Sequence, residues 1–194
     1  MSAYKSRVLN AVEAHCGGAF PAATALDLGA GDGWHAAEMS ARNLAGSVRA
    51  LEVQLRPNSR VEVEMYDGER IPMADRSVEL AYAFDVLHHC PEPLKVLREM
   101  MRCTDRYLLL KDHTFRNRFD RLVLAALDEI GNRRFGVPSI YKYQRGWEWV
   151  EQIEAEGFER CALVTPVRLA GFPLGHVSNQ LQFIGLWQRT AKLP

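Results

Sequence analysis

The chain has 194 residues, 47% hydrophobic and 25% charged, and is therefore long enough to bury roughly 70% of its unfolded surface in one domain. Its 24 basic residues equal its 24 acidic ones, and this zero formal charge argues against nucleic acid as a partner. The four cysteines form no CxxC pair, which argues against a zinc finger and a disulfide scaffold. No stretch has the length of a membrane span or the pattern of a signal peptide, so we expect a cytoplasmic protein.

Short apolar strands alternate with helical segments over the first half of the chain. Helical spacing predicts a helix over residues 1–16 that ends at Gly17 and Gly18. The alternation that follows predicts an α/β fold, a doubly wound and mostly parallel sheet with helices on both faces. The predicted strands are 23–28, 47–53, 59–67, 77–87 and 106–112, and the predicted helices between them include 34–44 and 91–103.

The rhythm changes after Asp112. An amphipathic helix is predicted over 119–132, a stretch without periodicity follows it, and another helix is predicted over 146–158. The last two predicted strands, 159–167 and 179–189, have no helix between them, so they must pair antiparallel or lie far apart. No repeat or linker divides the chain, and we expect a single domain, 1–194, that carries an insertion at about 114–146.

A glycine-rich turn between the first strand and its helix, in ALDLGAGDGWHAAEM, predicts a ligand site. Backbone N–H groups at such a turn point at the ligand, and glycine lets it approach closely. The dinucleotide fingerprint GxGxxG would need glycine where Trp34 stands, which disfavours an NAD-linked oxidoreductase. An acidic residue at the strand end followed by GxGxG resembles the first motif of class I S-adenosylmethionine-dependent methyltransferases; here these residues are Asp27, Gly29, Gly31 and Gly33.

Two later features strengthen this resemblance. Glu52 ends the second predicted strand about 20 residues after Gly33, where a ribose needs an acceptor for its hydroxyls, although NAD-binding folds share that spacing. The segment YDGERIPMADRSVELAYAFDVLHHCPEPLKVLREMMR then resembles the central signature of the family: an acidic residue, an Ile-Pro pair, a strand, an LHH turn and a helix. Over residues 20–112 the chain is thus similar to type 11-like small-molecule methyltransferases of class I.

The resemblance implies S-adenosylmethionine as the cofactor and assigns residues to it. Asp67 would accept a hydrogen bond from the adenine amino group, and Gly68 would flank the ring. Asp27 and Gly29 would hold the methionine end, and the carbonyl of Phe84 would accept a hydrogen bond from its amino group. The family also implies a Rossmann-like sheet of seven strands that ends in an antiparallel hairpin.

The run LLLKDH at the end of the fifth predicted strand supplies candidate catalytic residues. We expect this strand to direct its charged end at the cleft, with His113 as a general base that Asp112 orients. The alternative is that Asp112 or Thr114 caps the helix that follows. His88 and His89 share a turn with a helix start, and we expect them to be structural or cofactor-side residues.

The insertion at 114–146 is the predicted lid and acceptor pocket, because aromatic residues mix there with polar ones, although such aromatics also form ordinary core. They are Phe135, Tyr141, Tyr143 and, just beyond, Trp147.

The sequence thus predicts methyl transfer to a small-molecule acceptor at O, N or C. An inactive cofactor-binding subunit or regulator is the alternative. No cluster has metal-ligand spacing, so no metal is expected, and the oligomeric state is left open.

Overall fold

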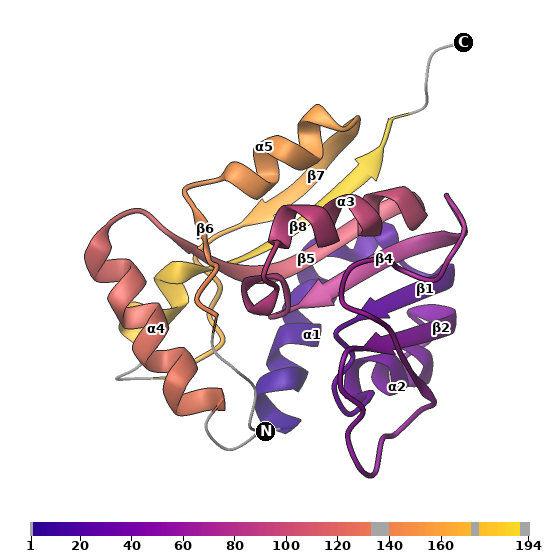
Figure 1. Ribbon diagram of the computed structural model, residues 1–194, viewed down its shortest axis with the longest axis horizontal. Coiled ribbons are helices and arrows are strands. Elements are labelled where there is room, and N and C mark those ends of the chain that lie inside the picture. The colour runs from indigo at the N-terminus through magenta and orange to yellow at the C-terminus, as the bar shows by residue number, and fades with distance from the viewer. Residues whose placement is uncertain (1, 133–139, 172–174, 191–194) are drawn as a thin grey trace.

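A single twisted sheet organises the protein in the computed structural model, which describes residues 2–132, 140–171 and 175–190 (Figure 1). Its strand order is β3-β2-β1-β4-β5-β8-β7, and a short additional strand, β6, pairs with β5. All neighbours pair in parallel except β8, which runs antiparallel to both β5 and β7. The strands are β1 Ala22–Leu28, β2 Ala45–Glu52, β3 Val63–Met65, β4 Val78–Phe84, β5 Thr104–Phe115, β6 Gln144–Arg145, β7 Phe158–Val164 and β8 Gln182–Arg189. The predicted doubly wound sheet with an antiparallel C-terminal hairpin is confirmed.

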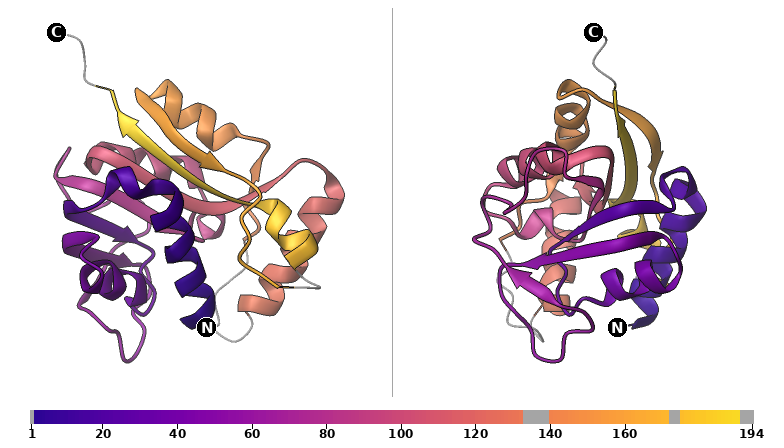
Figure 2. Two further views of the ribbon diagram at one scale, coloured as in Figure 1. Left: turned by 180° about the vertical axis from the view of Figure 1, so that it is seen from behind. Right: turned by 90° about the vertical axis from the view of Figure 1, so that its right-hand side faces the viewer.

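Helices cover both faces of the sheet, with α1 and α2 on one side and α3 and α5 on the other (Figure 2). The longer helices are α1 Ser2–Cys16, α2 Trp34–Ala41, α3 Pro93–Cys103, α4 Arg118–Asn132 and α5 Glu148–Ala155; the short ones are α6 Gly175–Ser178 and the 3₁₀ turns η1 Gly17–Ala19, η2 Leu87–His89 and η3 Asn179–Leu181. No helix in the described ranges has both the length and the apolar composition of a bilayer span. All four cysteines are free thiols.

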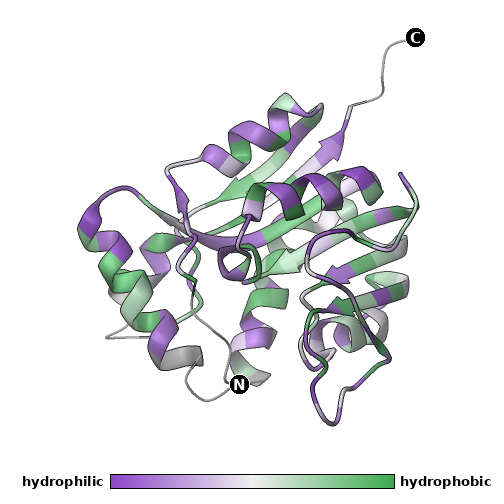
Figure 3. Ribbon diagram, viewed as in Figure 1, coloured by the Kyte–Doolittle hydropathy of each residue, from purple (hydrophilic) through white to green (hydrophobic). Residues whose placement is uncertain are grey.

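The central strands are buried on both faces, which explains their nearly continuous apolar sequences. Alternate residues of β4 enter opposite cores: Ala81 and Ala83 pack with α3 and α5, whereas Leu80 and Tyr82 pack with α1 and α2. Hydropathy follows the same division, because the strands are mostly apolar and the helices turn polar residues to solvent (Figure 3). Packing on both faces holds the strands in place, and this determines the positions of the strand ends.

Strand β5 is longer than the sequence predicts, and this corrects one expectation. The predicted strand ends at Asp112, but β5 continues to Phe115, because β8 pairs with it as far as His113 and β6 pairs with Thr114 and Phe115. Both Lys111 and Asp112 are buried within the strand. The charged triplet KDH is therefore part of the sheet and does not project beyond its end.

Helix α4 extends beside the sheet and is anchored by a small separate core (Figure 1). Leu124 is 3% exposed and packs with Tyr143 and Leu181, whereas Leu122 on the same helix is 68% exposed. The residues that connect α4 to the 140–143 segment lie outside the described ranges, and so does the predicted pocket residue Phe135.

We predict that Leu124→Ala lowers the free energy of unfolding by about 2–3 kcal/mol, because it leaves a cavity under α4. The matched substitution Leu122→Ala removes the same atoms from an exposed site and should change it by less than about 0.5 kcal/mol. Urea denaturation of both variants provides the measurement. Equal effects at the two positions would show that α4 does not pack against Tyr143 and Leu181 in solution.

Candidate functional site

The predicted cofactor residues gather at the edge of the sheet where the parallel strands end. The chain leaves β1 toward β2 and β3 on one side, and β4 and β5 continue on the other side. This reversal makes a topological switch point, the place where open α/β sheets bind ligands. Asp27, Glu52 and Phe84 all lie at the carboxyl ends of strands here, beside the glycine turn.

The turn between β1 and α2 needs its glycines for two different reasons. Gly29, Gly31 and Gly33 have φ values of 71°, 60° and 71°, a region that side chains rarely adopt. A Cβ on Gly29 would lie 2.5 Å from a methyl of Val86, and one on Gly33 would lie 2.7 Å from a methyl of Val61. A Cβ on Gly31 would meet only the flexible Arg56, at 3.5 Å. Neighbouring side chains thus leave no room for a Cβ at Gly29 or Gly33, whereas Gly31, in the middle of the turn, is next to only one flexible side chain.

Trp34 begins α2 and is buried in the core under α1, which explains why the third glycine of a dinucleotide fingerprint is missing. The indole fills space between helix and sheet, and so the helix does not need a glycine there for close packing.

Asp27 is a buried carboxylate with an unused oxygen. It is 2% exposed, and its Oδ2 has no hydrogen-bond partner among the described residues. Burial raises the pKa of Asp27 to about 7, and Glu52 adds to the increase, whereas Tyr82 and Lys5 oppose it. A buried acceptor without a donor is costly. Next to an open glycine turn it fits a ligand that brings an amino group, as S-adenosylmethionine does.

The other two acidic residues are held by backbone amides. Glu52 accepts hydrogen bonds from the amides of Gly31 and Val53, each at 2.8 Å. Asp67 is exposed, and its Oδ1 accepts from the amides of Glu69 and Arg70, also at 2.8 Å; these bonds lower the pKa of Asp67. Next to Asp67, Gly68 has a φ of 80° and lies against Val53. The tips of β2 and β3 thus adjoin each other, as a single nucleoside would require.

The edge also holds a polar cluster that the sequence did not predict: Tyr4, Asp85 and Lys111. Lys111 is 0% exposed, and its ammonium group donates to Asp85 and, at 2.7 Å, to the Tyr4 hydroxyl. The Tyr4 hydroxyl in turn donates to Asp85 at 3.0 Å. Burial alone would lower the pKa of Lys111, but Asp85 raises it, so the lysine is charged. Tyr4 lies in the first helix, Asp85 after β4 and Lys111 in β5, so only the fold brings these three residues together.

Asp112 joins the β4 end to β5 through buried hydrogen bonds. Its Oδ1 lies 2.6 Å from His88 Nδ1 and accepts from the amide of His113 at 2.7 Å, while Oδ2 accepts from the amide of Leu87 at 3.1 Å. The side chain of His113 is a more distant neighbour, because its Nδ1 lies 3.5 Å from both Asp112 and Asp85. His88 therefore makes the close side-chain contact with Asp112, and His113 lies between two carboxylates.

The alternative role in helix capping is wrong for both candidates. Asn117 caps α4, since its Oδ1 accepts from the amide of Asp120 at 2.9 Å. The hydroxyl of Thr114 instead donates to the carbonyl of Gly146 and ties β5 to the segment after β6.

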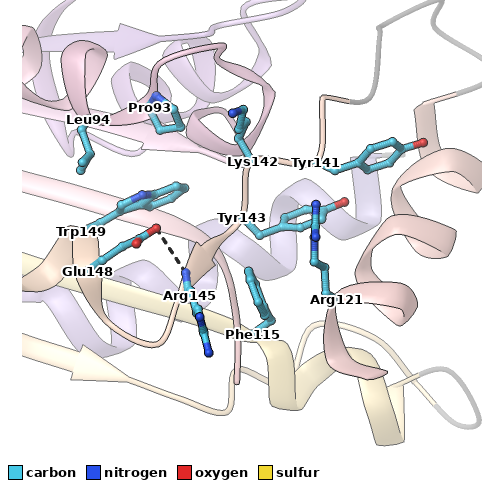
Figure 4. A pocket seen from close by; sticks show the side chains of 10 residues that line it. All are labelled: Pro93, Leu94, Phe115, Arg121, Tyr141, Lys142, Tyr143, Arg145, Glu148 and Trp149. Carbon is cyan, nitrogen blue, oxygen red and sulfur yellow. Dashed lines mark hydrogen bonds between the residues drawn. The ribbon is translucent and has the colours of Figure 1, made fainter. Parts of the chain in front are cut away.

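A cavity of about 330 Å³ lies between the start of α3, the end of β5 and the 140–145 segment (Figure 4), and the ring of its lining residue Tyr143 lies 6.2 Å from that of His113. The segment is held against the β4–α3 connection, because the amide of Lys142 donates to the carbonyl of His88 at 3.1 Å. Of the predicted pocket aromatics, Tyr141 and Tyr143 line the cavity, whereas Trp147 packs against Phe183 instead. The lining is Pro93, Leu94, Phe115, Arg121, Tyr141, Lys142, Tyr143, Arg145, Glu148 and Trp149.

The raised pKa of Asp27 leads to a prediction about stability. Its folded pKa of about 7 lies above the unfolded value of 3.8, so ionisation costs folding free energy as pH rises from about 4 to about 7. Asp27→Asn has no such cost. Measured by urea denaturation, the variant should therefore gain stability relative to the wild type between pH 4 and pH 8, by up to about 4 kcal/mol.

Asp32, in the same turn, provides a control of opposite sign. Burial would raise its pKa, but its 2.5 Å ion pair with Lys5 lowers it, so its charged form is stabilising. Asp32→Asn should lose stability relative to the wild type as pH rises through the acidic range. A pH-independent difference between Asp27→Asn and the wild type would contradict the raised pKa.

Comparisons with known proteins agree with this geometry. Residues 26–106 match a family model described as a methyltransferase domain. A chain of the complex between the Haloferax volcanii Trm112 methyltransferase activator and a methyltransferase has a TM-score of 0.67 at 13% identity, with 97% of this chain and 96% of that one covered. A sarcosine dimethylglycine methyltransferase structure from Galdieria sulphuraria also scores 0.67, at 14% identity, with 96% and 86% covered.

A S-adenosylmethionine-dependent methyltransferase from Aquifex aeolicus has a TM-score of 0.58 at 20% identity, with 87% of this chain and 82% of that one covered. No curated protein matches the chain. At these identities the structural neighbours show the shared fold, and the family model identifies a methyltransferase domain over residues 26–106. The cofactor is S-adenosylmethionine, which removes the NAD-linked alternative, and the chain carries a methyltransferase domain over residues 26–106 within a fold that it shares with S-adenosylmethionine-dependent methyltransferases.

Proposed function

We propose that the protein transfers a methyl group from S-adenosylmethionine to a small-molecule acceptor. The observation that carries the proposal is the pairing of two features at one edge of the sheet. One is Asp27 with its unpartnered oxygen beside an open glycine turn. The other is His113, whose Nδ1 lies 3.5 Å from Asp85, the carboxylate that also pairs with the buried Lys111. The match to a methyltransferase domain favours an enzyme over the inactive, cofactor-binding alternative.

The cofactor roles follow from where the residues lie. Asp27 and the turn at Gly29 would hold the amino acid end, with the carbonyl of Phe84 as a second acceptor. Glu52 would exchange its bond to the Gly31 amide for the ribose hydroxyls. Asp67 and Gly68, at the tip of β3, would hold the adenine. When bound, S-adenosylmethionine supplies a methyl group already activated on sulfur, so the protein has to orient the acceptor and exclude water.

His113 is the proposed general base where the acceptor carries a proton. Burial lowers the pKa of His113, and the ammonium of Lys111 lowers it further, so the imidazole is neutral near pH 7 and able to take a proton. Its Nδ1 has no hydrogen-bond partner within the described part of the chain. Asp112 would act as a positioning residue, because it holds the His113 amide and does not make a short contact with its ring.

The cavity lined by Tyr143, whose ring lies 6.2 Å from that of His113, is the proposed acceptor pocket, and the 114–146 insertion supplies much of its wall. Its aromatic lining suits a small organic molecule. Arg121, Lys142 and Arg145 outnumber the one acidic lining residue, Glu148, which favours an acceptor with an acidic group.

A methyl-transfer assay tests the function. The protein, S-adenosylmethionine labelled on the methyl group and fractionated cell metabolites should yield a labelled small molecule. Asp27→Asn, which keeps the shape of the side chain but removes its charge, should reduce labelling at limiting cofactor. Label confined to protein or nucleic acid, or no transfer in any fraction, would contradict the proposed acceptor class.

For the acceptor found, we predict that His113→Ala lowers kcat about 10²- to 10⁴-fold at saturating cofactor and acceptor, the usual contribution of a general base. The wild-type rate should fall as pH drops and His113 becomes protonated, and the variant should lose that dependence. The exposed His15 is the control, because His15→Ala removes an imidazole far from the sheet edge and should leave kcat unchanged. Full turnover by His113→Ala would exclude the role.

A further inference from the structure

We propose that His88, His89 and Asp128 form a binding site for a divalent transition-metal ion of the zinc type. Asp128 lies on α4 and the two histidines form the end of η2, so folding brings them together from separate elements. One ligand atom from each residue lies within 4.8 Å of the other two.

The spacing of the ligand atoms fits a small ion. Asp128 Oδ1 lies 3.6 Å from His88 Nε2 and 3.9 Å from His89 Nε2. In a tetrahedral zinc site with bonds of about 2.0–2.1 Å, neighbouring ligand atoms lie about 3.3 Å apart. Shifts of a few tenths of an ångström would bring Asp128 to this separation from both histidines, and the histidine ligand atoms lie within 4.8 Å of each other. Two imidazole nitrogens and one carboxylate oxygen are ligands that suit zinc and its neighbours in the first transition row better than Mg²⁺ or Ca²⁺.

Hydrogen bonds behind the ligands orient two of them for this task. His88 Nδ1 lies 2.6 Å from Asp112 Oδ1, which leaves Nε2 facing Asp128. A carboxylate behind a histidine in this way is a regular feature of metal sites. On the other ligand, Asp128 Oδ2 accepts a hydrogen bond from Tyr143 at 2.9 Å, and the Tyr143 ring stacks on His88 at 5.3 Å. The side chain of Tyr143 reaches toward α4 from the cavity wall (Figure 4).

A second grouping, His88 with Asp112 and His113, is less suited to an ion. Asp112 Oδ1 already accepts two short hydrogen bonds there, from His88 at 2.6 Å and from the His113 amide at 2.7 Å. An ion on that oxygen would compete with both bonds. The His88–His89–Asp128 site leaves both bonds intact. Its access is also better, since the side chains of His89 and Asp128 are 21% and 12% exposed.

The ligand count indicates what kind of site this is. Three protein ligands leave a fourth position for water or a substrate atom, as in catalytic zinc sites, whereas structural zinc sites have four protein ligands. The sequence did not reveal the site because Asp128 lies in a different helix from the histidine pair, with no motif spacing to link them.

Zinc titration of the full chain, with any affinity tag removed, tests the site. The wild type should bind one Zn²⁺ per chain against a competing chromophoric chelator. His89→Ala and Asp128→Asn should each weaken binding about 100-fold or more, and His15→Ala, which also removes one histidine, should not. Tyr143→Phe keeps the ring but loses the hydroxyl behind Asp128, and should weaken binding about 10-fold. Tyr141→Phe is its control, because the Tyr141 hydroxyl bonds Glu129 instead.

Three results would overturn the proposal. The first is no zinc binding by a wild-type chain that gives a normal thermal transition; His88 would then be a proton-carrying link between Asp112 and Asp128. The second is binding that His89→Ala and Asp128→Asn leave unchanged. The third is binding that His113→Ala abolishes while His89→Ala does not, which would place the ion in the other grouping. Circular dichroism and the thermal midpoint show whether each variant is folded.

Discussion

A lysine ammonium buried inside a β-strand is the constraint on which the rest of the site depends. Lys111 is fully buried in β5, and a buried charge without a partner is far too costly to persist. Its partners are Asp85, at the end of β4, and Tyr4, in the first helix. The pairing requires α1 to lie against the strand ends and requires β4 and β5 to stay in register there. Asp85 adopts a φ of 57° in this arrangement, a strained value for a non-glycine residue that the surrounding contacts sustain.

Sequence patterns predict the sheet because local chemistry fixes it. Apolar runs such as ATALDL are buried on both faces, and the glycine turn has no low-energy alternative at Gly29 and Gly33. The polar contacts of the site are not local. The cluster joins residues that are far apart in the sequence, namely Tyr4, Asp85 and Lys111, and their spacing therefore does not predict it. The end of β5 was misplaced for the same reason: pairing with β8 and β6, far along the chain, extends the strand beyond its apolar run.

Asp27 shows a conflict between stability and ligand binding. An unpartnered, buried carboxylate oxygen weakens the fold at neutral pH, and an apolar or amide side chain would be better tolerated there. The cost is understandable where a ligand supplies the missing donor. A ligand that binds only the folded state then recovers stability in proportion to its concentration over its dissociation constant. This protein should accordingly be most stable with its cofactor bound.

Asp112 connects the proposed base to the proposed metal ligands. One oxygen contacts both His88 and the backbone of His113, and the other fixes the start of η2 at Leu87. Burial would raise the pKa of Asp112, but His88 and His113 hold it well below its usual range, so the carboxylate is charged at neutral pH. A substitution at Asp112 would disturb the orientation of His88, the position of His113 and the β4–α3 connection together. A substitution at Asp112 would therefore not distinguish the proposed general base from the proposed metal site. His113 and His89 are the informative positions, because each belongs to only one of the two proposed sites and neither is the residue that joins them.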